Sequence, residues 1–280
     1  MSLRTTLAAT GTSAALVAAV ATAAPASAAL PAVDMARVVV AGQVEPRCGQ
    51  TAGLSDNPST VRVQQALTAR GISTTADGWY GSGTTGSYAT WQRRLGYSGI
   101  DANGLPGTGS LTKLGANRFT VAHPVTVGSR TDTYGGRRVN TRTRQMLAAA
   151  DAKLPFAIRL TQGSYNPGGV GASAGTHDGG GVVDVTVTGL TTTQRWQLVR
   201  ALRTVGFAAW LRTPAQGFAY HVHAVAIGDP DLWQQDGGHV ARDQVCDYWR
   251  GRNGLASHAA DNTPSAYRVA FTWWERYRGI

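Results

Sequence analysis

Residues 176–187 read THDGGGVVDVTV, a glycine-rich turn that runs directly into a strand of alternating pattern. Successive side chains of a strand point to opposite faces, so the valines at 183, 185 and 187 are predicted to face the core and Asp184 the opposite side. A second strand is predicted at residues 221–227, where the same rule places His221 and His223 together on one face.

Two imidazoles and one carboxylate are the predicted ligands of one metal ion, those of His177, Asp184 and one of the pair His221 and His223. The other histidine of the pair can hydrogen-bond a substrate oxyanion or water. Three such ligands with one open position are typical of a catalytic zinc site, and the glycines at 179–181 let the backbone approach closely. Half of the six histidines of the chain fall in these two short runs, which favours a common role. Two alternatives stay open: ordinary hydrogen-bonded histidines, and a structural metal.

The pattern around these strands predicts an α+β domain over residues 137–235. A helix is expected at 141–153, a short strand at 157–161 and a long glycine-rich loop at 163–181. Thr191 and Gln194 form a capping-box signature for a further helix that ends at Gly206.

The N-terminal half has a different pattern. Helices are predicted from residue 56 to 71, near 85–95 and at 110–114, separated by glycine-rich turns, so residues 55–117 are predicted to form a three-helix domain. Residues 29–54 and 118–136 lack clear periodicity and are interpreted as linkers.

This three-helix pattern resembles the small peptidoglycan-binding domain. The matching residues are Val63-Gln64-Gln65-Ala66-Leu67, Asp77-Gly78-Trp79-Tyr80-Gly81, Trp91-Gln92 and Gly104-Leu105-Pro106-Gly107. The resemblance implies a module that targets the bacterial cell wall. The alternative is that the aromatic residues Trp79, Tyr88 and Trp91 only form a core.

The second half resembles the zinc D-alanyl-D-alanine peptidases and their Hedgehog-like relatives over approximately residues 137–230. The resemblance rests on His-x6-Asp with a glycine three residues after the histidine, followed by His-x-His. It implies an α+β fold with a central antiparallel sheet, zinc held by His177, Asp184 and His223, and His221 beside the metal. Gly180 is the matching glycine, which we assign to substrate binding.

The chain departs from this family at the general base. Family members carry an acidic residue close to the His-x-His, but residues 216–220 contain no carboxylate, and the only glutamates of the chain are Glu45 and Glu275. Because a positioned base contributes about 10²- to 10⁴-fold in rate, its replacement matters. The candidates are Asp178 and Asp229, and Tyr220 or His221 could instead polarise the substrate.

The family's substrate-binding arginine is also not clearly matched. Residues 162–166 stand where the family places it, so Gln162 and Ser164 are predicted to contact substrate. Arg159 is a possible replacement for the missing arginine.

The first 28 residues are predicted to be a secretory signal peptide. Arg4 precedes the apolar stretch Ala14–Ala24, and Ala26-Ser27-Ala28 offers small residues for cleavage. No cysteine stands at the predicted new N-terminus, so no lipid anchor to the membrane is expected there. In an oxidising compartment a disulfide between Cys48 and Cys246 is expected, with two unpaired thiols as the alternative.

The net charge of +10 comes almost entirely from arginine and favours polyanionic partners. The expected partners are peptidoglycan and anionic cell-wall polymers. No nucleic acid is expected, because no basic run with interleaved aromatics occurs.

We expect a secreted, wall-associated monomer whose C-terminal tail, residues 236–280, packs on the second domain. The leading hypothesis is a zinc peptidase acting on peptidoglycan stem peptides or cross-links. The rival is a wall-binding protein that keeps the metal site without hydrolysis.

Overall fold

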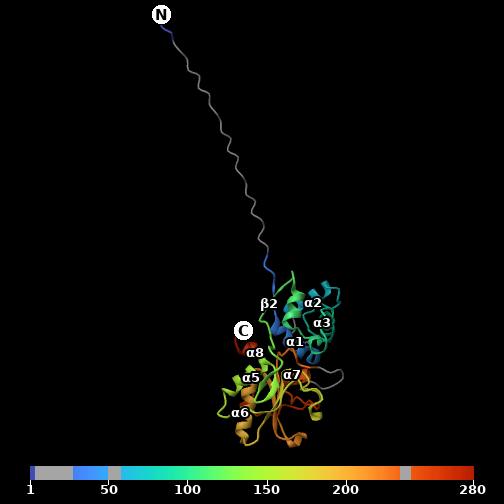
Figure 1. Cartoon of the computed structure of the whole chain (residues 1–280), viewed down its shortest axis with the longest axis vertical. Helices are drawn as coiled ribbons and strands as arrows, with labels where there is room; N and C mark the ends of the chain where they lie inside the picture. The colour runs from blue at the N-terminus through green and yellow to red at the C-terminus, as the bar shows by residue number, and fades with distance from the viewer. Residues whose placement is uncertain (4–27, 50–57, 234–240) are drawn as a thin grey trace.

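The computed structural model describes residues 1–3, 28–49, 58–233 and 241–280. The chain has an α+β fold, in which helices α1, α2 and α3 lie together at one end and α5 and α6 flank a sheet at the other (Figure 1). Most of the predicted signal peptide, residues 4–27, lies outside the described residues. Within the described ranges no helix has the length and apolar character needed to cross a membrane.

The three helices predicted in the N-terminal half are confirmed as α2 (Pro58–Ala69), α3 (Ser82–Arg94) and α4 (Thr108–Gly115). Two of their aromatic residues, Tyr88 and Trp91, are buried, in agreement with the alternative that these residues form a core. Tyr88 is fully buried, and its hydroxyl pairs with Ser110 Oγ at 3.0 Å. Trp91 donates from Nε1 to the Ser110 backbone oxygen at 3.0 Å. Gly104 has φ of +81°, and a Cβ atom there would lie 2.5 Å from the Thr85 backbone oxygen, so this turn requires glycine.

The linker predicted at 29–54 is wrong over its described part. Residues 32–48 instead form strand β1 (Ala32–Asp34) and helix α1 (Met35–Cys48), and most of α1 is buried. Asp34 caps the helix, since its carboxylate accepts the Arg37 backbone N–H at 3.0 Å. A helix that is buried on nearly all sides has no polar face, so its sequence shows no amphipathic period.

The second predicted linker, residues 118–136, also contains strands. Strand β2 (Thr120–Ala122) pairs in parallel with β1. Strand β3 (Asp132–Tyr134) forms a hairpin with β4 (Arg137–Val139) through the Gly135–Gly136 turn, in which both glycines have positive φ. Strands of three residues are too short to give a periodic signal.

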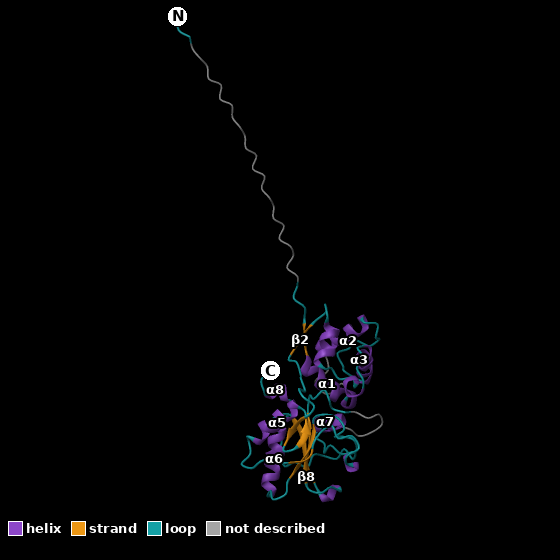
Figure 2. Cartoon of the chain, in the orientation of Figure 1, coloured by secondary structure: helices purple, strands orange, loops and turns teal. Residues whose placement is uncertain are grey.

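The largest sheet has four strands in the order β5-β6-β8-β7, and every neighbouring pair is antiparallel (Figure 2). Its members are β5 (Leu160–Gln162), β6 (Val182–Thr186), β7 (Phe207–Arg212) and β8 (His221–Ala226). Strands β6 and β8 match the predictions, and β5 lies at the end of its predicted range. Strand β7 was not predicted, because all six of its residues are buried and alternation is absent.

The two faces of the sheet are covered by different elements. One face packs against α5 (Thr141–Asp151) and α6 (Thr192–Thr204), both predicted, and the capping box of α6 is present at Thr191 and Gln194. The other face joins a single hydrophobic core with α1, α2 and α4. The sheet residues in that core are Val182, Ala208, Trp210 and Val225. The boundaries predicted around the helical domain are therefore crossed by one continuous core.

The C-terminal segment packs on both parts of the chain. Helix α7 (Ala241–Trp249) contacts α1, β7 and β8, and the short helix α8 (Trp274–Tyr277) follows near the end of the chain. The predicted disulfide is confirmed: Cys48 of α1 and Cys246 of α7 are bonded, with their Cα atoms 5.6 Å apart. Among the described residues there are four short 3₁₀ segments, at Gly99–Ala102, Gly171–Ser173, Pro214–Gln216 and Ser265–Tyr267.

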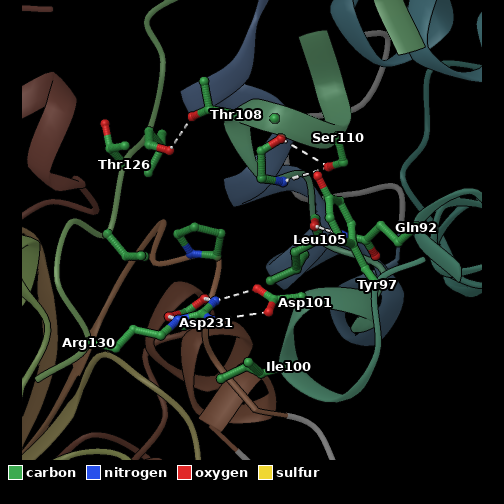
Figure 3. Close-up of a pocket in the computed structure, with 15 residues that line it drawn as sticks. Gln92, Tyr97, Ile100, Asp101, Leu105, Thr108, Ser110, Thr126, Arg130 and Asp231 are labelled. Carbon is green, nitrogen blue, oxygen red and sulfur yellow. Dashed lines mark hydrogen bonds and ion pairs between the residues drawn. The ribbon is translucent and has the colours of Figure 1, made fainter. Parts of the chain in front are cut away.

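Arg130 links the helical part to the segment that follows β8. Its guanidinium contacts Asp101 at 2.6 Å and Asp231 at 2.7 Å (Figure 3). These groups border a cavity of about 350 Å³ between the two parts. In these ion pairs the positive charge of Arg130 is balanced by the carboxylates of Asp101 and Asp231.

Candidate metal centre

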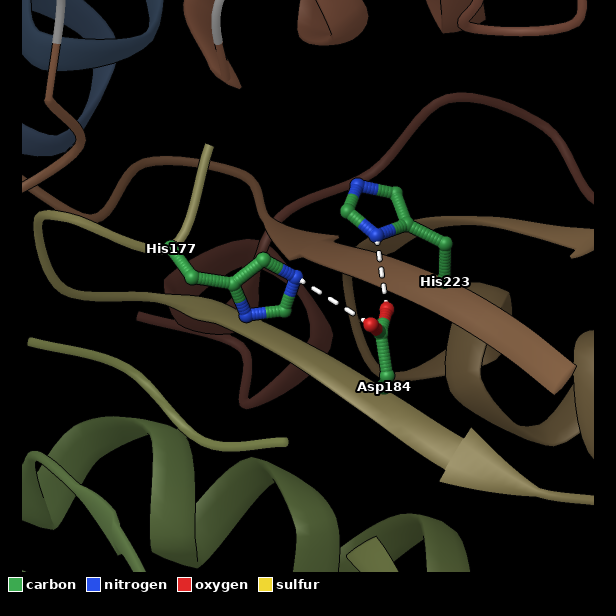
Figure 4. Close-up of side chains that lie close together, drawn as sticks. All are labelled: His177, Asp184 and His223. Carbon is green, nitrogen blue, oxygen red and sulfur yellow. Dashed lines mark hydrogen bonds and ion pairs between the residues drawn. The ribbon is translucent and has the colours of Figure 1, made fainter. Parts of the chain in front are cut away.

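Three side chains converge on the face of the sheet that carries α1 and α7. The ligand atoms of His177, Asp184 and His223 all lie within 4.8 Å of one another (Figure 4). Asp184 of β6 stands directly opposite His223 of β8 in the strand register, and His177 comes from the glycine-rich loop. His223 Nδ1 is 2.8 Å from Asp184 Oδ1, and His177 Nε2 is 3.4 Å from Oδ2. This buried group could hold a metal ion.

The outward-facing nitrogen of each histidine is held by an acceptor. His177 Nδ1 is 2.9 Å from the Gly163 backbone oxygen, and His223 Nε2 is 2.9 Å from Gln244 Oε1. The Gln244 amide is oriented in turn, because its Nε2 donates to the Gly254 backbone oxygen at 3.0 Å. Carbonyl oxygens only accept, so these outer nitrogens carry the protons when the imidazoles are neutral.

It follows that His177 Nε2 and His223 Nδ1 present lone pairs toward the Asp184 carboxylate. Lone pairs that face an anion repel it, and a cation between them removes the repulsion. His177 Nε2 is buried and has no hydrogen-bond partner among the described residues. A metal-binding histidine commonly donates its other ring N–H to a carbonyl or carboxylate, as both histidines do in this site.

The protonation states also suit a cation. Burial favours a higher pKa for Asp184, but when His177 and His223 also carry a proton on their inner nitrogens, their hydrogen bonds and positive charge outweigh burial and hold the pKa of this carboxyl well below its usual value. Burial lowers the pKa of His223, against the opposing effect of Asp184. A carboxylate and a neutral imidazole are the forms that bind a metal ion.

The cluster opens into a cavity of about 440 Å³. The cavity is bordered by the glycine-rich loop, the segment before β8 and residues 254–256 of the C-terminal segment. Arg212 of β7 also lines it, and its guanidinium donates to the backbone oxygens of Asn253 and Gly254 at 2.6 and 3.1 Å. Burial lowers the pKa of Arg212 to about 10, against the opposing charge of Asp184. Arg212 is therefore a cation at neutral pH.

His221 also reaches the cavity, as predicted from its strand position. Its Nε2 is 3.7 Å from Asp184 Oδ1, and its Nδ1 is 2.7 Å from the Ala219 backbone oxygen. Since a backbone oxygen accepts, Nδ1 carries the proton in the neutral ring and Nε2 offers a lone pair. Asp184 is the only carboxylate among the residues that line this cavity in the described part of the chain.

The structure does not bring the other three catalytic candidates to the cavity. Asp229 lies beyond the opposite end of β8, fully buried, and accepts from Asn140 Nδ2 at 2.8 Å. Burial raises the pKa of Asp229 to about 6. Asp178 does not line the cavity. The ring of Tyr220 is exposed and packs under the guanidinium of Arg195, 4.6 Å from its centroid.

Among the predicted substrate contacts, Gln162 alone lines the cavity. Ser164 is buried and donates from Oγ to the Val182 backbone oxygen at 2.7 Å. Arg159 is exposed and lies outside the lining. Gly180 has a packing role, because a Cβ atom there would lie 2.5 Å from the Tyr165 hydroxyl oxygen.

Two polar residues of the site were missed. Arg212 ends a strand whose other residues are apolar apart from the indole N–H of Trp210, and a lone arginine in such a run is a usable signal once the strand is recognised. Gln244 gave no signal, since its helix belongs to a segment interpreted as a tail. It reaches His223 only because α7 packs on the sheet and is bonded to α1 through Cys246.

Comparisons with known proteins identify no relative: no family model, curated protein or solved structure matches the chain.

Proposed function

We propose that this protein is a secreted zinc peptidase that cleaves stem peptides or cross-links of peptidoglycan. The observation that carries the proposal is the convergence of His177 Nε2, Asp184 and His223 Nδ1 at the floor of an open cavity. The donor set of two imidazoles and one carboxylate is that of open, catalytic zinc sites, whereas structural sites are closed by four ligands and are usually rich in cysteine. A bound zinc ion would lower the pKa of a water molecule and polarise a peptide carbonyl.

His221 is the proton acceptor in this proposal. It lines the cavity, its Nε2 lone pair faces inward, and no carboxylate other than Asp184 reaches the cavity from the described residues. The buried cation Arg212 lies on the same side of the sheet and favours negative charge in the cavity. Positioned positive charge stabilises the oxyanion that develops when a peptide carbonyl is attacked.

The three helices α2, α3 and α4 support the wall-targeting part of the proposal. They reproduce the helix and turn order of the peptidoglycan-binding pattern, including the glycine that the turn at Gly104 requires. The net charge of +10 favours adsorption to anionic wall polymers. A targeting module beside a peptidase cavity is a consistent pairing.

The rival function is a wall-binding protein that holds zinc without hydrolysis. The cavity composition favours it, because the acidic general base expected for the family is not among the described lining residues. The ligand atoms and their outer hydrogen bonds are equally consistent with either function.

One experiment separates the two. The purified mature protein is analysed for bound metal and incubated with peptidoglycan, and released peptides and new amino termini are recorded by mass spectrometry. The proposal predicts about one zinc ion per chain and cleavage that a chelator abolishes. Bound zinc without cleavage supports the rival, and a chain that binds no zinc contradicts both.

His221→Gln tests the proton acceptor. Glutamine keeps a hydrogen-bonding side chain but cannot take a proton, so the turnover number should fall by about 10²- to 10⁴-fold while zinc content stays unchanged. His123→Gln is the matched control, because His123 is exposed and pairs with Asp34 away from the cavity. An unchanged turnover number for His221→Gln would remove this residue from the mechanism.

A further inference from the structure

A second cavity adjoins the metal-site cavity. It has a volume of about 530 Å³ and lies between residues 161–166 and the β3–β4 hairpin. Gln162 and Val170 line both cavities, so the two are neighbours on either side of these residues. A ligand longer than one residue that occupies the metal-site cavity can continue past Gln162 into the second.

The second cavity carries positive charge that no carboxylate among its described lining residues balances. Arg137 and Arg138 are the charged residues of that described lining. Arg138 is held in place, since its Nε donates to the Arg130 backbone oxygen at 2.8 Å and its guanidinium lies 5.0 Å from the centroid of the Tyr165 ring. Arg137 is exposed on the hairpin, and no ion pair of its side chain occurs within the described residues.

Gln162 provides a hydrogen-bond donor at the junction. Its Oε1 accepts from Ser173 Oγ at 3.0 Å, which fixes the amide. Its Nε2 is buried and has no partner among the described residues. An unsatisfied buried donor is unfavourable, and a peptide carbonyl that passes between the cavities would satisfy it.

We propose that the second cavity is a subsite for a free carboxylate of the peptide whose reacting bond lies at the metal cluster. Arg137 and Arg138 bind the carboxylate, and Gln162 Nε2 donates to a backbone carbonyl between the two cavities. The assignment rests on the proposed function in taking a peptide as the ligand. It adds that the peptide is acidic on the side that enters the second cavity.

Three synthetic peptides test the proposal by isothermal titration calorimetry with the full mature chain. The first is Ala-γ-D-Glu-Lys-D-Ala-D-Ala with both carboxylates free. In the second the α-carboxylate of the D-Glu residue is an amide, and in the third the C-terminal carboxylate is an amide. Mass spectrometry of each titrated sample records cleavage separately from binding.

We expect the free acid to bind about 10- to 150-fold more tightly than one of the two amides, the range given by hydrogen bonds to a charged group. The amide that weakens binding identifies which carboxylate enters the subsite. Arg137→Gln with Arg138→Gln should bring the acid and that amide to equal affinity. The charge-matched control, Arg93→Gln with Arg118→Gln, removes two exposed arginines of the helical part and should retain the preference.

Equal affinity of the unsubstituted chain for all three peptides would overturn the subsite, as would the absence of any binding. Retention of the acid preference in the double variant would place the carboxylate elsewhere and overturn it as well. A chain that prefers the acid but contains no zinc and cleaves nothing contradicts the proposed function and leaves the subsite standing.

Discussion

The two faces of the four-stranded sheet are formed by the same strands but have different roles: one face packs into a hydrophobic core, and the other carries the candidate metal site. The face under α5 and α6 is apolar along its whole length, with Val183, Val185 and Val222 at less than 2% exposure. The opposite face is apolar at one end, which joins the core around α1, and polar at the other, where Asp184 and His223 meet beside Gln244 of α7. Alternation along a strand allows one segment to supply a core and a site at once.

The comparison of the two faces shows what holds the metal-binding side chains in place. The valines behind the ligands fix β6 and β8 in register, and this register places Asp184 opposite His223. Substitutions on the apolar face should therefore change stability, and substitutions on the polar face should change metal binding.

The largest expected effect is that of His177→Ala. This change removes one of three ligands and a buried nitrogen that has no other partner in the described structure, so zinc content should fall from about one ion per chain to near zero. Metal analysis after dialysis measures it. His123→Ala should retain its zinc, and a His177→Ala protein with full zinc content would break the assignment.

Leu202→Ala tests the other face. Leu202 is fully buried between α6 and the sheet, so the free energy of unfolding should fall by about 2–5 kcal/mol. Denaturant titration measures the loss. Zinc content of the folded variant should stay at the unsubstituted level, and its loss would show that the two faces are not independent.

Gln244→Ala should have an intermediate effect on the site. Loss of the acceptor at His223 Nε2 frees the imidazole to rotate, and zinc affinity should fall by about 10- to 100-fold. Competition with a chromophoric chelator measures the affinity. Gln244→Glu keeps an acceptor at the same place and should lose less. An unchanged affinity for Gln244→Ala would mean that this hydrogen bond does not orient the ligand.

The smallest expected effect lies in α1. Burial raises the pKa of Glu45 to about 7, although a hydrogen bond from the Tyr80 backbone N–H opposes the rise. The folded chain then binds more protons than the unfolded chain between about pH 4.5 and 7, so the free energy of unfolding should fall as the pH rises through this range.

Glu45→Gln isolates this contribution. The fall in unfolding free energy between pH 5 and 8 should become shallower by about 1–3 kcal/mol, measured by denaturant titration at each pH. Asp229, whose pKa is also raised, contributes a slope of the same sign, so some pH dependence should persist. A variant with the slope of the unsubstituted chain would show that Glu45 is ionised in the folded protein.

Sequence reasoning was strongest where the pattern was local. Alternation in β6 and β8 predicted that the side chains of Asp184 and His223 point away from the valine face of the sheet. His177 of the glycine-rich loop was predicted as the further ligand, and the three side chains do converge. It failed for α1 and β7, since elements buried on all sides show neither a helical nor an alternating period. Gln244 depends on tertiary packing of α7 and could not be read from neighbouring residues.

The prediction of Asp229 as a general base was wrong for a different reason. Asp229 lies three residues after the end of β8, and proximity in sequence suggested proximity to the site. A strand rises about 3.3 Å per residue, so β8 carries its two ends far apart, with His221 at one and Asp229 beyond the other. Residues at opposite ends of an extended strand are therefore far apart in space, even when only a few residues separate them in the sequence.

The most direct test of the central claim is anomalous diffraction at the zinc edge from crystals of the mature protein grown with zinc. The account predicts one strong peak about 2.0–2.2 Å from His177 Nε2, an Asp184 carboxylate oxygen and His223 Nδ1. A peak at other residues, or none at this cluster, would contradict it.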